Sequence, residues 1–214
     1  MDVDRRELLR SYAVRAHALV LSDECLLRID RYVALLALWN QRIRLTGASD
    51  ETLLVERHVA DSLAVAPLVP PRGSFVDIGS GAGFPGVVVQ TVRDDVRGTL
   101  IEPRRRRASF LSEVARTLPL PNVSVRCARA EDPLIRSTEA GLADLVVSRA
   151  IRLDAFLPLA APLLKVGGVA VSMQAINASP TDTHGELGLH PIPVIDYSLP
   201  DNSPRRLLLF QRVC

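Results

Sequence analysis

The feature that most constrains this chain is the stretch from Ser74 to Gly86, which reads SFVDIGSGAGFPG. Phe75, Val76 and Ile78 form the apolar run that is typical of a covered strand in a parallel sheet. The glycines that follow remove the Cβ atom at alternate positions, so a ligand can approach the backbone closely. Pro85 suits the first turn of a helix, where its missing N–H costs nothing. The stretch therefore predicts a strand, a glycine-rich turn that takes a cofactor, and a helix.

The spacing of the glycines limits which cofactor fits. Gly79, Gly81 and Gly83 give G-x-G-x-G, whereas the dinucleotide fingerprint has its third glycine one residue later, where this chain has Phe84. A phosphate-binding P-loop is also excluded, because no Gly-Lys-Ser/Thr follows and Lys165 is the only lysine. The turn instead resembles the first motif of the class I S-adenosylmethionine (SAM) methyltransferases, in which the glycines pass under the methionine part of the cofactor. The alternative is a tight turn without a ligand.

Composition sets broad limits. With 214 residues, 48% of them hydrophobic, the chain can bury one sizeable core, and we expect one domain with an appendage. The net charge of +2 does not by itself indicate a nucleic-acid partner. Between Arg93 and Arg129, however, nine arginines accompany only four carboxylates. Because the planar arginine fork donates paired hydrogen bonds to phosphate, this interval is the candidate for contact with RNA.

Cysteine usage and hydropathy indicate the compartment. Cys25, Cys127 and Cys214 are far apart and form no C-x-x-C pair, so the sequence predicts neither a disulfide framework nor a metal site. No signal-peptide core and no uninterrupted apolar segment of about 18 residues is present in the sequence. We therefore expect a cytoplasmic protein with no membrane partner. Our expectation for the oligomeric state is a monomer.

The segment before the glycine turn has helical periodicity. One helix is expected from Ser22 as N-cap to Thr46, ended by Gly47, and Ser49 is the expected N-cap of a second helix. Residues 1–72 are thus predicted to form an N-terminal helical cap. Residues 73–214 are predicted to form one compact cofactor-binding domain.

After the turn, strands and helices alternate, which favours a parallel sheet with helices on both faces. The expected strands are Gly98–Glu102, Val123–Cys127, Asp144–Ser148 and Val169–Gln174, followed by a hairpin of Ile192–Tyr197 and Arg206–Val213. The expected helices are Arg104–Leu118 and Leu153–Leu164, the second ending in a turn at residues 165–168. Loops are expected around Ser137–Gly141 and over the polar stretch Ala175–His190.

Two side chains stand at the carboxyl ends of strands, the edge where open α/β sheets bind ligands. Glu102 ends the second strand, where a carboxylate can accept both hydroxyls of a cofactor ribose; the alternative is contact with solvent or with one of the arginines 104–107. Arg149 follows the fourth strand and is the candidate active-site arginine; the alternative is an ion pair with a carboxylate of the helical cap. Ala130 and Glu131, just past the third strand, stand where such folds bracket adenine.

A polar cluster interrupts the second helical segment. His58 and Asp61 are three residues apart, and Arg57 and Asp61 four apart, so all three lie on one helix face. His58 could act in catalysis, or it could be a hydrogen-bonded structural group. Four consecutive arginines from Arg104 to Arg107 open the helix after the second strand, facing either solvent or RNA phosphate.

Several motifs together carry a family resemblance: Trp39-Asn40, Leu45-Thr46, Glu56-Arg57-His58-x-x-Asp61-Ser62, the stretch Asp77 to Gly86, Arg129-Ala130-Glu131 and Ser148-Arg149-Ala150. They resemble the bacterial 16S ribosomal RNA guanine-N7 methyltransferase family, methyltransferase G, also called glucose-inhibited division protein B. The likeness covers about Leu26 to Gln174. It implies a class I fold, an α/β doubly wound seven-stranded sheet with the last strand antiparallel, and a SAM-dependent enzyme that modifies a guanine in the small ribosomal subunit.

The resemblance also implies roles for individual residues. The implied cofactor-binding residues are Asp77, Gly79, Ser80, Gly81, Gly83, Phe84, Pro85, Glu102, Ala130, Glu131 and Arg149. The implied catalytic residues are Arg149 and Arg129, which would orient the guanine through O6 or a phosphate. The candidates for RNA contact are Arg44, Arg57, His58, Arg106, Arg107 and Gln174. Guanine N7 has an exposed lone pair and no proton, so its methylation needs alignment and no general base.

Some positions depart from the family pattern. The chain has Arg44-Leu45-Thr46 for Asn-Leu-Thr, Pro103 for a small polar residue, and Gln174-Ala175 for Lys-Gly. These departures concern the substrate side more than the cofactor side. Two alternatives therefore stay open: a methyltransferase of the same fold that acts on a small metabolite or another RNA, and a non-catalytic protein that binds SAM or the ribosome.

Overall fold

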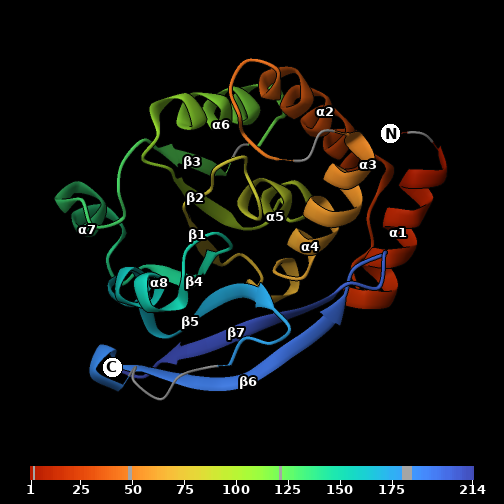
Figure 1. Ribbon diagram of the computed structural model, residues 1–214. Coiled ribbons are helices and arrows are strands. Elements are labelled where there is room, and N and C mark those ends of the chain that lie inside the picture. Colours follow the sequence, from red (N-terminus) through yellow and green to blue (C-terminus); the bar gives the residue numbers. More distant parts are fainter. Residues whose placement is uncertain (2, 48–49, 121, 180–184) are drawn as a thin grey trace.

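The computed structural model describes residues 1, 3–47, 50–120, 122–179 and 185–214. Its centre is a seven-stranded sheet in the order β3-β2-β1-β4-β5-β7-β6 (Figure 1). The strands are β1 (Ser74–Ile78), β2 (Arg97–Ile101), β3 (Val123–Arg126), β4 (Ala143–Ser148), β5 (Leu164–Ala175), β6 (Leu189–Ser198) and β7 (Pro204–Arg212). The last strand, β7, is antiparallel to both its neighbours, whereas β1 to β5 pair in parallel. The predicted fold class is thereby confirmed.

Helices cover both faces of the sheet. The α-helices are α1 (Val3–His17), α2 (Asp23–Asn40), α3 (Glu51–Leu53), α4 (Ala60–Leu63), α5 (Gly86–Val92), α6 (Arg105–Thr117), α7 (Pro133–Glu139) and α8 (Leu153–Ala160). The other helical turns are the π-helix η1 (Leu54–Val59) and the short η2 (Ala66–Leu68), η3 (Ala161–Leu163) and η4 (Gly185–Leu187). Figure 1 shows α7 and α8 on one side of the sheet, and α2, α4, α5 and α6 on the other.

The side chains of β1 show why helices must cover both faces of the sheet. Successive side chains of a strand point to opposite faces. Phe75 belongs to the apolar core on the side of α2, α5 and α6, while Val76 and Ile78 belong to a second core with α7 and α8. All three side chains are buried, so the apolar run found in the sequence reports a central strand between two helical layers.

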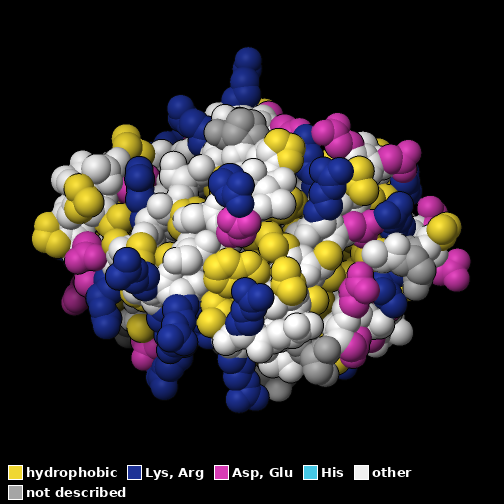
Figure 2. Space-filling view, turned by 90° about the horizontal axis from the view of Figure 1, so that it is seen from above, with side chains coloured by type: hydrophobic (Ala, Val, Ile, Leu, Met, Phe, Trp, Pro, Cys, Tyr) yellow, Lys and Arg dark blue, Asp and Glu magenta, His cyan; other side chains and the backbone are white. Residues whose placement is uncertain are grey.

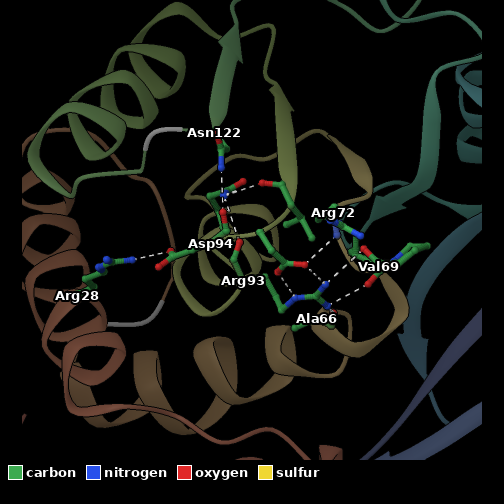
Figure 3. A network of polar contacts seen from close by, with 11 residues as sticks. Arg28, Ala66, Val69, Arg72, Arg93, Asp94 and Asn122 are labelled. Carbon is green, nitrogen blue, oxygen red and sulfur yellow. Dashed lines mark hydrogen bonds and ion pairs between the residues drawn. The ribbon is translucent and has the colours of Figure 1, made fainter.

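Polar contacts tie the N-terminal helices to the loop between α5 and β2 (Figure 3). Arg28 of α2 donates to Asp94 Oδ1 across 2.7 Å. Arg93 donates from Nη1 to the backbone oxygens of Ala66 (2.8 Å) and Val69 (3.0 Å). Apolar side chains of both parts also share one core. A division of the chain at residue 72 stays a prediction.

The N-terminal helices differ from the sequence expectation. Helix α1 was missed, and α2 ends at Asn40 instead of Thr46, so Gly47 does not end it. The reason is that Asn40 Oδ1 accepts hydrogen bonds from the backbone of Leu45 (2.9 Å) and Thr46 (3.1 Å), which holds those residues in a loop. The expected cap Ser49 lies outside the described residues. Asp50 caps α3 by accepting from the Leu53 N–H across 3.0 Å.

Two further expectations were wrong after β3. The expected loop around Ser137–Gly141 is largely helix α7, which begins at Pro133, a favoured first helical position. The expected turn at residues 165–168 lies inside β5, where the pairing with β4 shifts register; Gly167 has a φ of +84° there. Of the expected loop Ala175–His190, residues 180–184 lie outside the described part and β6 already begins at Leu189. In the described part of the chain, no helix is long and apolar enough to cross a membrane.

Candidate functional site

The glycine-rich turn connects β1 to α5 in a backbone conformation that residues with a side chain rarely adopt. The φ angles of Gly79, Gly81 and Gly83 are +78°, +57° and +99°. At Gly83 a Cβ atom would lie 2.6 Å from Val87 Cγ2, so packing alone requires this glycine. At Gly81 the nearest atom to such a Cβ would be Arg107 Nη1, at 3.6 Å. The positive φ therefore favours glycine at position 81, and a side chain there would contact Arg107.

The N-terminal helices hold this turn in place. Tyr32 of α2 is fully buried, and its hydroxyl donates to the Ala82 backbone oxygen across 2.6 Å. Burial raises the pKa of Tyr32 well above its ordinary value, so the hydroxyl keeps its proton. The ring of Tyr32 also makes an edge contact with Phe84, with the centroids 5.5 Å apart. The helical segment thus fixes the shape of the turn from outside the sheet.

Glu102 lies at the end of β2 beside the turn, as the sequence predicted. Only 3% of it is exposed, its Oε2 accepts from the Gly81 N–H (2.9 Å), and its Oε1 accepts from the Arg104 N–H (2.8 Å). No ion pair joins Glu102 to an arginine side chain among the described residues. A carboxylate has about four lone-pair sites, so Glu102 can still accept hydroxyl groups of a ligand.

A cavity of about 300 Å³ opens at Glu102. It brings together six of the candidate site residues that the sequence singled out: Gly79, Glu102, Arg107, Arg129, Ala130 and Glu131. The sequence reasoning missed its apolar wall, which Ile151 and Leu159 provide from the segment after β4 and from α8. An apolar wall facing a buried carboxylate fits an adenosine group, whose base is flat and whose ribose donates hydrogen bonds.

Asp77 is fully buried under the turn. Its Oδ2 accepts from the Gly86 N–H across 2.9 Å, while its Oδ1 has no hydrogen-bond partner among the described residues. Ser80 donates to the Asp77 backbone oxygen (3.0 Å). Burial raises the pKa of the Asp77 carboxyl to about 7. Asp77 thus fixes the start of α5, directly after Pro85.

A second cavity, of about 290 Å³, lies at the ends of β4 and β5 and is lined by Arg149, Gln174, Asp61 and Arg205 among others. Arg149 pairs through Nε with Asp61 Oδ2 (3.1 Å). This contact is the ion pair to the helical cap that the sequence left as an alternative. Arg149 also lies over the ring of Phe84, 5.8 Å from its centroid, so it connects this cavity with the glycine-rich turn, whose Gly79 lines the first cavity.

His58 is held between Arg149 and the turn. Arg149 Nη2 lies 2.7 Å from His58 Nδ1, and the His58 ring stacks on Phe84 with centroids 5.2 Å apart. Because arginine can only donate, Nδ1 must be the unprotonated acceptor and Nε2 carries the proton. Burial, and then the charges of Arg149, Arg57 and Arg205, lower the pKa of His58 to about 4. His58 is therefore a neutral partner of Arg149.

The sequence reasoning missed Tyr197, which arrives from β6. Its hydroxyl donates to Asp61 Oδ1 across 2.6 Å, and Arg205 Nε lies 3.9 Å from the same oxygen. Tyr197 and Arg205 are paired in the closing hairpin, so one register places both. The available signal was Asp61 itself, since a carboxylate within an apolar helical stretch needs partners when it is buried.

Other predicted residues lie apart from this cluster. Arg57 is more than half exposed and pairs with Asp201 (3.2 Å), and Arg129 lines the cofactor cavity rather than that of Arg149. Arg44 is exposed, and its backbone oxygen accepts from Arg107 (3.5 Å). Arg106 lines a separate groove. Within the described ranges, no group of three or more potential metal ligands is found.

Comparison with known proteins decides the family. The family model described as rRNA small subunit methyltransferase G matches residues 26–182. The chain belongs to this family. Proteins named ribosomal RNA small subunit methyltransferase G include one from Methylobacillus flagellatus, 33% identical over 92% of this chain and 93% of its own length. Another, from Clavibacter michiganensis, is 43% identical over 71% of each chain, and one from Syntrophus aciditrophicus is 35% identical over 74% of this chain and 67% of its own.

Solved structures share the fold of this methyltransferase G family member. Geranyl diphosphate C-methyltransferase from Streptomyces coelicolor has a TM-score of 0.57 at 16% identity, covering 85% of this chain and 98% of that one. M. jannaschii TYW2, solved in complex with AdoMet, has a TM-score of 0.57 at 17% identity, covering 73% and 76%. The cofactor of the family is SAM, and the cavity at Glu102, which Gly79 of the glycine-rich turn also lines, fits it.

Proposed function

We propose that this methyltransferase transfers a methyl group from SAM to N7 of a guanine in 16S ribosomal RNA of the small subunit. The observation that carries the proposal is the contact of Arg149 with Phe84, since it puts a cavity lined by an arginine next to the turn that borders the cofactor cavity. The names of the family and of its relatives support the RNA substrate.

The cofactor side of the proposal rests on Glu102, Gly81 and the apolar wall. Glu102 would accept the ribose hydroxyls, Ile151 and Ala130 would pack on adenine, and Gly81 would let the methionine part approach the backbone. Bound SAM supplies an electrophilic methyl group on a positively charged sulfur. The chain must then bring a nucleophile into line with it and exclude water.

On the substrate side, Arg149 is the residue that would orient the base. Its Nε and Nη2 are engaged by Asp61 and His58, while Nη1 makes no hydrogen bond within the described part of the chain. In guanine, O6 lies beside N7 and accepts hydrogen bonds, so a donor at Nη1 would hold O6 and aim the N7 lone pair. N7 carries no proton, so neutral His58 positions Arg149 and need not remove a proton.

Arg129 would act at the rim of the cofactor cavity, where its side chain is 71% exposed and lies 3.7 Å from Glu131. From that position it could reach an RNA phosphate beside the bound cofactor. Action on ribosomal subunits would require the protein to work in the cytoplasm, as the cysteine usage also predicts. The monomeric state stays a prediction.

The experiment is transfer of a labelled methyl group from SAM by the purified protein. Small subunits from a strain that lacks this enzyme, their protein-free RNA and a pool of small metabolites are offered in parallel, at low and at high salt. We expect label in the RNA of the subunits, decreasing as salt rises because phosphate contacts are screened. SAM binding without label in either RNA sample, or label in a small metabolite, would overturn the proposal.

A further inference from the structure

A groove outside both cavities runs between α2 and α6. Its volume is about 270 Å³, and it is lined by Leu38, Trp39, Arg42, Ile43, Arg106 and Ser109. The lining is mainly apolar. Trp39 is half-buried and packs against Phe110 of the core, with ring centroids 5.6 Å apart. This contact holds the indole ring in place at the side of the groove. Neither the cofactor side nor the substrate side of the proposed reaction uses this groove.

Unneutralised arginines surround the groove. Arg42 and Arg106 line it, both are exposed, and neither side chain makes a hydrogen bond or ion pair with any described residue. Arg104 and Arg105, at the start of α6, do not line the groove but are likewise exposed, and neither side chain makes a hydrogen bond or ion pair with a described residue. Figure 2, which views the molecule from the side of α2 and α6, shows hydrophobic side chains gathered among Lys and Arg side chains. The arginines favour an anionic partner, and the apolar wall beside them favours one that also carries a flat apolar group.

We propose that this groove holds one unstacked base of a single-stranded RNA segment, with the base against Trp39 and the flanking phosphates at Arg42 and Arg106. Aromatic side chains bind bases by stacking, and arginine binds phosphate through its planar fork. The inference rests on the proposed RNA substrate and adds a second contact to it. Both sites take a lining residue from the first turn of α6, since Arg106 lines the groove and Arg107 lines the cofactor cavity.

The only tryptophan of the chain lines the groove, so intrinsic fluorescence reports on this place alone. Trp39 emission is followed while the full-length protein is titrated with a short unstructured RNA oligonucleotide. The same titration is made with a duplex RNA of equal length and with inorganic polyphosphate. We expect saturable quenching by the single strand, and little by the duplex or the polyphosphate. Polyphosphate supplies the negative charge without a base.

Substitutions on one helix then test the groove. Ser109→Phe fills it, whereas Ser112→Phe makes the same change three residues further along α6, outside the groove lining. We expect Ser109→Phe to raise the Kd for the single strand by about 5- to 100-fold, the range of one stacked base, and Ser112→Phe to leave it within about twofold. Calorimetry with SAM should give the wild-type affinity for both variants, which shows that they are folded.

A second pair tests the phosphate contact. Arg106→Ala should reduce the slope of log Kd against log salt by about 0.7, the value for one phosphate of a single strand. Arg116→Ala, on the same helix, removes an arginine that already pairs with Glu113 (2.8 Å), and it should leave the slope unchanged.

Three results would overturn the inference. They are RNA binding that leaves Trp39 emission unchanged, equal quenching by polyphosphate, and wild-type RNA affinity of Ser109→Phe. A fourth, in which groove variants weaken binding to assembled subunits but not to RNA, would assign the groove to a protein instead.

Methyl transfer to unmodified subunits is measured separately. A protein that quenches with RNA but methylates no subunit contradicts the proposed function, while a methylating protein without quenching contradicts only the groove.

Discussion

Arg149 Nη2 and His58 Nδ1 lie 2.7 Å apart, although 91 residues separate them in the chain. The arginine can only donate, so the contact exists only while His58 is neutral at Nδ1. His58 also stacks on Phe84 of the glycine-rich turn. His58 therefore links three parts of the protein: its hydrogen bond joins the N-terminal helices to Arg149, and its ring stacking joins them to the glycine-rich turn.

This link makes folding stability depend on pH. The folded-state pKa of His58 is about 4, below its ordinary value of 6.5, so protonation favours the unfolded chain. The stabilisation is fully present above pH 6.5 and is lost as the pH falls toward 4. Between pH 7 and pH 5 the loss from His58 amounts to about 2 kcal/mol in the free energy of unfolding.

His58→Asn isolates this effect, because asparagine keeps an acceptor for Arg149 and does not titrate. We expect the variant to lose about 2 kcal/mol less than the wild type between pH 7 and pH 5, measured by denaturant unfolding. His17, with a pKa lowered to about 4 by burial, and Asp77, with a pKa raised to about 7 by burial, titrate in both proteins and cancel. Equal pH dependence in the two proteins would contradict a neutral His58.

Tyr197 positions Arg149 through Asp61. Tyr197→Phe removes the donor to Asp61 Oδ1 and leaves a carboxylate that is only 3% exposed with one bond fewer. We expect a loss of about 1–3 kcal/mol in stability and a fall in kcat larger than any change in KM for SAM. Unchanged kcat in the folded variant would mean that Tyr197 only stabilises the hairpin.

Part of this site could be predicted from sequence and part could not. The glycine-rich turn, Glu102 and Arg149 follow strands whose apolar runs are visible in the sequence, and the ends of parallel strands meet at one edge. The link from Asp61 to Tyr197 spans 136 residues and depends on the register of the last hairpin. No local pattern encodes that register. The groove at Trp39 depends likewise on how α2 packs against α6.

The elements of the fold were likewise predictable only in part. The central strands β1 and β4 were found because they are apolar on both faces. Ser22 was found because its side chain accepts from the Cys25 N–H (3.2 Å), as an N-cap does. Helix α1 was missed because charged and apolar residues are mixed around it, without a clear apolar stripe. The end of α2 was missed because a side chain, Asn40, takes over the backbone hydrogen bonds beyond it.

Gly81→Val tests the cofactor turn. The backbone at Gly81 is in the left-handed region, and a side chain there would contact Arg107, which lines the cavity proposed for SAM. We expect SAM binding to be lost in calorimetry while the circular dichroism spectrum stays that of the wild type. Gly83→Ala should instead lower the melting temperature, because its Cβ would collide with Val87. Wild-type SAM affinity of a folded Gly81→Val protein would refute the cofactor site.

Glu102→Gln tests the ribose contact. The amide keeps the size of the side chain but loses the charge and offers N–H groups where the carboxylate accepts from Gly81 and Arg104. SAM affinity should fall by about 1–3 kcal/mol. Glu186→Gln is the matched control: Glu186 is exposed and lies outside the cavity lining, so we expect a change below about 0.5 kcal/mol. Equal effects of the two substitutions would contradict the special role of Glu102.

The proposed reaction is methylation of guanine N7 in 16S ribosomal RNA, with Arg149 as the residue that orients the base. The most direct measurement is mass mapping of methylated guanines in 16S RNA from a strain that lacks this enzyme, after it receives the wild type, Arg149→Ala or Arg152→Ala. Arg152 lies three residues further on, exposed and paired with Asp154 (3.0 Å). We expect one restored 7-methylguanine with the wild type and with Arg152→Ala, and little or none with folded Arg149→Ala. No 7-methylguanine with the wild type, or full restoration by Arg149→Ala, would contradict it.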